Sequence, residues 1–281
     1  MPFKNLQKQR KLVLDITVED LYEYAEAREE IRRRKESGLP QSEWTKDELF
    51  SIGRFNNIFR EDDKTSVFIF KHAKGLQGLM LWRHIFICRY INRIDRLSEV
   101  LPLPATSLKL HFETNLNPNK ALTNSCAYQL HSGIGKPLGV KGARNALYEL
   151  DSVIQPTYEA LLQSSSITGA TESVNNAFGG YITFFAYQAV LDWAQLTDNE
   201  ELLSSEPYIG DGAHAAGNAL GMSATTIANL QTIYWPQAKR SMRPFDVENL
   251  MCEYRKYHKR ATEGIQSETS KYRPNFLGIG Y

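Results

Sequence analysis

The stretch from Tyr181 to Leu196 constrains the fold most, because it is apolar on most faces of a helix. A helix that is hydrophobic all round has to be covered by other elements, so we expect this one to be central. A second apolar stretch, residues 77–100, predicts another long buried helix, with Arg83, His84 and Arg89 on its other faces. Together with the helical spacing of apolar residues elsewhere, these two stretches predict a mainly α-helical chain.

Capping signals place further helices. Thr17-Val-Glu-Asp predicts a helix start whose acidic first turn suits the helix dipole, and this helix runs to about Lys35. Thr45-Lys-Asp-Glu48 has the pattern of a capping box, which predicts a helix that reaches Phe59. Asp246 is expected to cap a basic helix near the end of the chain.

Other segments are less regular. Residues 67–70 fit either a short strand or the start of a buried helix, since so short a run cannot separate the two. Residues 105–139 are rich in Asn, Gly and Pro and predict a loop-rich insertion with at most a small hairpin, formed by 107–113 and 126–131. Residues 141–163 predict one more helix.

The chain shows no internal repeat and no low-complexity linker. We therefore predict an N-terminal helical extension over residues 1–44 and a single helical domain over residues 45–281. Its 33 Lys and Arg residues nearly balance 32 Asp and Glu residues, which gives a net charge of +1. Any affinity for nucleic acid must then come from local basic patches rather than from the overall field.

Several function classes are disfavoured by the residues present. Three widely spaced cysteines argue for reduced thiols and a cytoplasmic setting. The six histidines lack metal-ligand spacing, so catalytic zinc is not expected. No Walker-type loop is present, and no segment is apolar enough to span a membrane.

The candidate site begins with the pattern R-x-x-N-x-x-R-x-x-D, formed by Arg54, Asn57, Arg60 and Asp63. On an α-helix, steps of three residues would spread the first three over about 120° of one face, where arginines could hold an anion. Asp63 lies a further step round. The alternative interpretation is an amphipathic surface helix whose charges are only solvated.

Two further features extend this site. Asp192 is a lone carboxylate on the most apolar helix, which is costly unless it is paired, so a structural and a functional role are both open. The turn Tyr-Ile-Gly-Asp-Gly-Ala-His over residues 208–214 opens a short helix whose amides could bind a phosphate. It fits the hairpin of a helix-hairpin-helix element, and a plain turn remains the alternative.

Basic residues interleaved with aromatic ones follow near the C-terminus, in Tyr254-Arg-Lys-Tyr-His-Lys-Arg260 and in Lys271-Tyr-Arg-Pro274. Such residues can pair with phosphates and stack on bases. They can equally be side chains that snorkel from a helix end.

In their order, these motifs resemble the phage thymine-hypermodification proteins termed α-glutamyl/putrescinyl-thymine pyrophosphorylases. That group includes amino acid:DNA transferases and the helical domain attached to some hydroxymethyluracil DNA kinases. The resemblance covers about residues 45–275 and implies an all-α fold akin to helix-hairpin-helix DNA glycosylases. It also implies a DNA substrate, 5-pyrophosphoryloxymethyl-deoxyuridine, on which an amine from an amino acid or polyamine replaces the pyrophosphate.

The resemblance assigns roles residue by residue. Arg54, Asn57, Arg60, Asp63 and Asp192 would be catalytic, with the arginines neutralising the leaving pyrophosphate. The residues that would bind DNA phosphates are Gly210, Gly212, His214, Lys256, Lys271 and Arg273. Related sequences tend to have arginine at the position of His214, so the grip on phosphate here would be weaker or would depend on pH.

Two other functions remain open. A DNA glycosylase would usually carry an aspartate about 20 residues beyond the hairpin glycines, whereas residues 213–245 contain no Asp or Glu. A non-catalytic DNA-binding module is the third hypothesis. No cofactor is required by the sequence, although magnesium could accompany the pyrophosphate. The expected partners are DNA with a modified thymine and a small amine or amino-acid donor, and no membrane.

Overall fold

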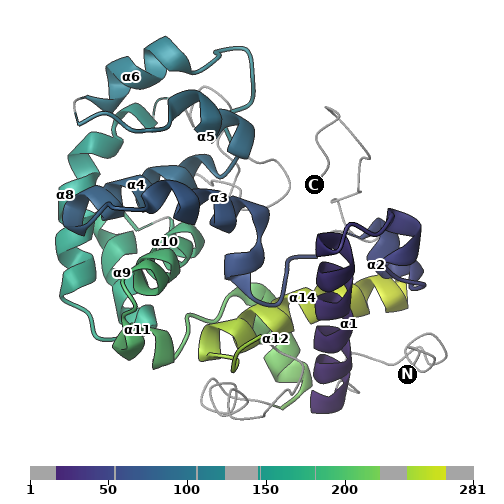
Figure 1. The fold of residues 1–281 in the computed structure, drawn as a ribbon. Helices are drawn as coiled ribbons and strands as arrows, with labels where there is room; N and C mark the ends of the chain where they lie inside the picture. Colours follow the sequence, from purple (N-terminus) through teal and green to yellow (C-terminus); the bar gives the residue numbers. More distant parts are fainter. Residues whose placement is uncertain are drawn as a thin grey trace. The chain divides into compact units, whose positions relative to one another are not determined.

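The computed structural model describes residues 17–53, 55–105, 107–123, 145, 147–180, 182–221 and 239–263. Over these residues all regular structure is helical, which confirms the prediction of a mainly α chain (Figure 1). The elements are α1 (Val18–Glu36), η2 (Gln41–Glu43), α2 (Glu48–Ile52), η3 (Arg60–Asp62), α3 (Lys64–Ala73), α4 (Gly78–Ile91), α5 (Ile94–Val100), α6 (Leu108–Asn115), α8 (Leu150–Leu162), α9 (Ile167–Ala177), α10 (Thr183–Leu196), α11 (Glu200–Ser204), α12 (Asp211–Ala219) and α14 (Pro244–Glu263).

Contacts group the chain into two compact units. Unit 1 consists of Met1–Asp63 and Ile209–Tyr281, and it contains α1, α2, α12 and α14. Unit 2 is the continuous segment Lys64–Tyr208, from α3 to α11. The predicted extension over residues 1–44 stays a prediction, as does the single domain over residues 45–281.

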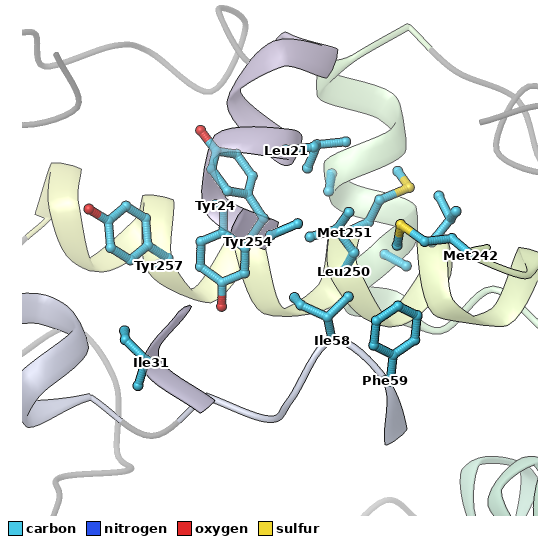
Figure 2. Close-up of a cluster of buried hydrophobic side chains, with 14 of the residues drawn as sticks. Leu21, Tyr24, Ile31, Ile58, Phe59, Met242, Leu250, Met251, Tyr254 and Tyr257 are labelled. Atoms are coloured by element: carbon cyan, nitrogen blue, oxygen red, sulfur yellow. The ribbon is translucent and has the colours of Figure 1, made fainter. Parts of the chain in front are cut away.

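The core of unit 1 is built around α14, which packs against α12, α1 and α2. Figure 2 shows Ile58 and Phe59 lying beside the same helix although they come from the segment after α2. Tyr24 of α1 meets Tyr254 and Tyr257 of α14 with ring centroids 5.5 Å apart in both cases. Edge-on aromatic pairs of this kind are favourable beyond the area they bury.

Helix α1 begins as the sequence predicts. The Thr17 hydroxyl accepts from the Asp20 N–H at 3.2 Å, and the Asp20 carboxylate accepts from the Thr17 N–H at 2.9 Å. The last turn carries Arg33, Arg34 and Lys35, which suit the negative end of the helix dipole.

The core of unit 2 is formed by α4 and α10. Every residue from Phe185 to Ala194 is buried, so the prediction that this helix is central to a core is confirmed. Trp82 and Phe86 of α4 meet Trp193 and Phe185 of α10 at ring-centroid distances of 6.2 Å and 4.7 Å. Helix α8 contacts α4 and α9, and α9 contacts α10.

The predicted single helix over residues 77–100 is wrong. Helix α4 ends at Ile91 because Asn92 adopts a left-handed conformation with φ of 45°, and its N–H bonds to the Cys88 carbonyl oxygen. Asparagine tolerates this conformation better than most residues. Helix α5 then begins at Ile94, so the apolar pattern continues through a break in the backbone.

The structure also tests the predictions made for three shorter segments. Residues 67–70 belong to helix α3, which decides between the two earlier possibilities. Residues 107–113 do not form a hairpin strand, since α6 starts at Leu108, and residues 126–131 lie outside the described residues. Helix α14 begins at Pro244, two residues before the predicted cap. Asp246 sits in its first turn and accepts from the Arg243 N–H at 2.7 Å.

Candidate functional site

The segment that carries the R-x-x-N-x-x-R-x-x-D pattern is not the continuous helix that the sequence predicts. Helix α2 ends at Ile52, and Gly53 has an extended backbone. A Cβ on Gly53 would lie 2.5 Å from the Leu49 carbonyl oxygen, so only glycine fits there. The cap also differs, because Asp47 rather than Thr45 accepts from the first helical N–H groups.

Residues 55–59 instead form a non-helical segment that is bonded by side chains of two helices. The Arg28 guanidinium of α1 donates to the Phe55 carbonyl at 2.9 Å and to the Asn56 carbonyl at 3.2 Å. From α14, the Asn249 amide donates to the carbonyls of residues 57 and 58 at 2.9 Å and 3.0 Å. These bonds satisfy backbone groups that a helix would have paired internally.

Within the motif, Asn57 and Asp63 close a turn. The Asn57 N–H donates to Asp63 Oδ1 at 3.0 Å, and its side-chain amide donates to the Asp62 carbonyl at 2.9 Å. Arg60 begins the short helix η3 and is 6% exposed. Arg54 lies outside the described residues. Three members therefore share one turn rather than one helical face, and their catalytic roles stay predictions.

Beside this turn lies an ion cluster that the sequence did not indicate. Arg240 donates to Glu61 Oε1 at 2.8 Å and to both oxygens of Asp246, at 2.5 Å and 3.0 Å. Burial would raise the pKa of Glu61, but the Arg240 guanidinium outweighs it and lowers that pKa to about 2. Complete burial dominates at Asp246 and raises its pKa to about 6, against the opposing effect of Arg240.

The glycine turn opens a helix, as predicted. Gly210 is the N-cap of α12, and a Cβ on Gly212 would lie 2.6 Å from Cys252 Sγ of α14. Gly212 therefore permits close packing of two helices. Glu248 Oε1 lies 3.4 Å from the Cβ position of Gly210, so an acidic side chain already stands near this helix start.

The remaining predicted phosphate-binding residues have separate surroundings. His214 is exposed, and its ring is 3.2 Å from the Asn218 amide nitrogen. Lys256 pairs with the buried carboxylate of Glu253, one turn earlier on α14. Lys271 and Arg273 lie outside the described residues.

Asp192 belongs to unit 2, where it has a full partner. Arg89 of α4 bonds both of its oxygens, at 2.6 Å and 2.7 Å, and both side chains are nearly fully buried. The same guanidinium donates to Ser66 Oγ of α3 at 2.7 Å. This bidentate bridge links three helices, and it explains how an acid is tolerated on the most apolar helix. A catalytic role for Asp192 stays a prediction.

Two buried polar groups of unit 2 have no hydrogen-bond partner in the described structure. Gln188 precedes Asp192 by one turn on α10 and is 2% exposed, and its Nε2 is unpaired. The Thr171 hydroxyl on α9 is also unpaired and fully buried. Unpaired buried donors are uncommon and call for a physical explanation.

Cys88 and His84 form a second buried polar pair on α4. The Cys88 sulfur lies 3.7 Å from His84 Nε2. Burial raises the pKa of the Cys88 thiol and lowers the pKa of the His84 imidazole. Both groups are therefore held neutral, unlike the thiolate and imidazolium of a nucleophilic cysteine.

The sequence prediction missed Arg89, Ser66, Asn92 and Gln188. A signal for Arg89 was present, because an arginine in an apolar helix needs a buried partner and Asp192 is the lone acid on the other apolar helix. Among the described residues, no group of three or more His, Cys, Asp or Glu side chains could hold a metal ion. In that same part of the chain, no helix is both long and apolar enough to cross a membrane.

Comparison with protein families matches most of the chain to one family. The model of the helical domain of 5-hmdU DNA kinase matches residues 15–215. The chain belongs to this family. Neither the curated proteins nor the solved structures gave a match. Membership in the 5-hmdU DNA kinase helical family confirms the thymine-hypermodification part of the resemblance, and it does not select the amine transferases.

The family description sets the substrate class. The chain takes part in hypermodification of 5-hmdU in DNA, and DNA carrying that base is the substrate that the family implies. The match includes all of unit 2 and the segment from residue 54 to residue 63. It ends inside α12, so α14 and Lys256 lie beyond it.

Proposed function

We propose that the chain serves the phosphorylation step of thymine hypermodification. In this proposal it binds DNA carrying 5-hydroxymethyluracil and presents the hydroxymethyl oxygen for phosphoryl transfer. The observation that carries the proposal is the match to the 5-hmdU DNA kinase helical domain over residues 15–215, which takes in the whole of unit 2.

The residues of this chain suit the DNA side of that reaction. Phosphoryl transfer depends on positioning the acceptor and neutralising charge on the phosphate. The printed sequence holds no G-x-x-x-x-G-K-S/T loop to cradle a nucleotide, so we assign no residue to the phosphate donor. A magnesium ion, when bound with the donor, would supply charge neutralisation at the phosphate oxygens.

Recognition of the base requires a contact with one hydroxyl group, because 5-hydroxymethyluracil differs from thymine only there. A site built to hydrogen-bond a substrate hydroxyl rejects the analogue that lacks it. We propose that the Gln188 amide makes such a contact, since it is buried in unit 2 and its Nε2 has no partner in the described structure. Reaching a base in duplex DNA requires flipping it out of the stack.

Amine transfer to a pyrophosphorylated base is the second candidate. One observation favours it: Arg60 and Asp63, two residues assigned to that chemistry by resemblance, remain within a single turn closed by the Asn57–Asp63 hydrogen bond. In this version the Arg60 guanidinium would neutralise the departing pyrophosphate.

Nucleoside analysis separates the two candidates. DNA carrying 5-hmdU is incubated with ATP, magnesium and a nucleotide-binding kinase domain of the same family, with and without this chain, then digested and analysed by mass. Our proposal predicts that the chain raises the yield of the phosphorylated nucleoside. A parallel reaction offers pyrophosphorylated DNA and a pool of amines, where an amine-bearing thymidine would support transfer. Phosphorylation that is unaffected by the chain contradicts the proposal.

A further inference from the structure

The first 31 residues of unit 2, residues 64–94, carry a net positive charge. Residues 64–94 contain no Asp or Glu, although the whole chain has a net charge of only +1. The basic residues of this stretch are Lys64, Lys71, Lys74, Arg83, Arg89 and Arg93. The three arginines bond to carboxylates of Asp151, Asp192 and Asp95. The three lysines are exposed: Lys64 and Lys71 belong to α3, and Lys74 directly follows it.

These lysines share one face of α3. At 100° per residue, Lys64, Val67, Lys71 and a helical continuation to Lys74 fall within about 80° of one another. The buried residues Ser66, Ile69 and Ala73 occupy the opposite face. The cationic side of α3 therefore points away from the core of unit 2.

Lys71 and Lys74 have no acidic neighbour on the described helix that packs most closely against α3. Helix α3 packs against α4, which has no Asp or Glu. Asp192 is connected to α3 through Arg89, which also bonds Ser66, and this arginine already bonds both oxygens of its carboxylate. Lys71 and Lys74 make no ion pair with any described residue. Their charges are thus not neutralised within the described part of unit 2.

We infer that the α3 face formed by Lys64, Lys71 and Lys74 binds the phosphate backbone of the DNA substrate. Lys64 and Lys71 are about 10 Å apart along the helix axis, which is about three 3.4 Å nucleotide steps along one strand. Val67, which is 53% exposed between them, adds apolar contact for the sugars. This inference rests on the proposed DNA-binding function and names the surface that performs it.

Salt titration of DNA binding tests the inference. The double variant Lys71→Gln/Lys74→Gln is compared with wild type and with Lys46→Gln/Lys109→Gln, which removes two other exposed lysines. Each lost phosphate contact lowers the slope of log K against log salt by about 0.9. We expect the α3 variant to lose about 2 in slope and about tenfold in affinity at low salt, while the control stays near wild type.

Base preference separates failure of the inference from failure of the proposed function. Phosphate contacts carry no sequence information, so the α3 variant should weaken binding to 5-hmdU DNA and to thymine DNA by the same factor. A slope equal to that of wild type, or an equal loss in the control, overturns the inference. A wild-type protein without preference for 5-hmdU DNA overturns the proposed function instead. Unchanged circular dichroism of the variants shows that each is folded.

Discussion

Gln188 is a buried side chain whose unpaired amide lowers stability, and we have proposed that it contacts the modified base. Its amide is 2% exposed and its Nε2 has no hydrogen-bond partner in the described structure, a state that costs about 1–3 kcal/mol in a folded protein. A cost of this kind persists where a ligand supplies the missing partner. The hydroxyl group of 5-hydroxymethyluracil has the chemistry to do so.

Replacing Gln188 with methionine, which has a similar volume, should therefore raise the free energy of unfolding by about 1 kcal/mol. The same variant should bind 5-hmdU DNA and thymine DNA equally well. Denaturant unfolding and DNA titrations measure the two effects. Thr171→Val is the matched control, because it removes the other unpaired buried polar group of unit 2, a hydroxyl, and should stabilise the protein while leaving base preference intact. Retained preference in Gln188→Met would refute the role given to the amide.

Glu61 gives unit 1 a predictable pH dependence. Its pKa falls from 4.5 to about 2 in the folded protein, so the stability it contributes is complete above about pH 4.5 and is lost as the pH falls toward 2. We expect Glu61→Gln to lower the free energy of unfolding by about 2 kcal/mol at pH 7 and by progressively less below pH 4.5. Asp246 acts oppositely, because its pKa is raised to about 6 and its ionisation costs stability as the pH rises from about 4 to 6.

Unfolding of Glu61→Gln and wild type across pH 2 to 7 measures this difference directly. A stability difference that stays constant with pH would show that Glu61 gains nothing from Arg240 in the folded state.

At the scale of elements, α3, α4 and α10 are linked by the bridge from Arg89 to Asp192 and Ser66. Asp192→Ala leaves a buried guanidinium without its carboxylate, so we expect a loss of about 3–5 kcal/mol in unfolding free energy. The double replacement Arg89→Met/Asp192→Leu removes both charges and should recover most of that loss. Urea unfolding of the variants checks the pair. An Asp192→Ala protein as stable as wild type would show that the bridge does not hold these helices together.

Elements with one uninterrupted pattern could be predicted from the sequence, and others could not. Helix α10 was predicted because its apolar run has no internal break. The break at Asn92 was missed because one left-handed residue leaves the apolar spacing intact. Phe55, Ile58 and Phe59 have helical spacing too, but they pack from a non-helical segment whose partners on α14 are about 190 residues away in sequence. Local pattern carries no information about such partners.

The candidate site was predictable to a similar extent. Asp192 was identified because burial of a lone acid demands a partner, whereas the partner itself is 103 positions away. Gln188 gave no signal, since a glutamine in a helix is ordinary until its surroundings are known. The α3 lysines appear in the sequence as separate charges, and only the helical assignment of residues 64–73 places them on one face.

At the scale of the whole molecule, the family match includes the part of the chain that holds the residues proposed to bind DNA, which is unit 2. The match to the 5-hmdU DNA kinase helical domain covers all of Lys64–Tyr208, which holds the α3 lysines, the Arg89–Asp192 bridge and Gln188. With a net charge of +1, any affinity of the chain for DNA has to come from such a local surface rather than from the overall field. Base preference must then come from buried polar groups.

Equilibrium binding to matched duplexes tests this account most directly. Two duplexes of the same sequence, one with 5-hydroxymethyluracil and one with thymine at a single position, are titrated with the full chain at fixed salt. We predict tighter binding to the hydroxymethylated duplex by at least about tenfold, the effect of about 1.4 kcal/mol from one hydrogen bond to the hydroxyl. Equal affinity for the two duplexes would contradict the claim that this chain recognises the modified base.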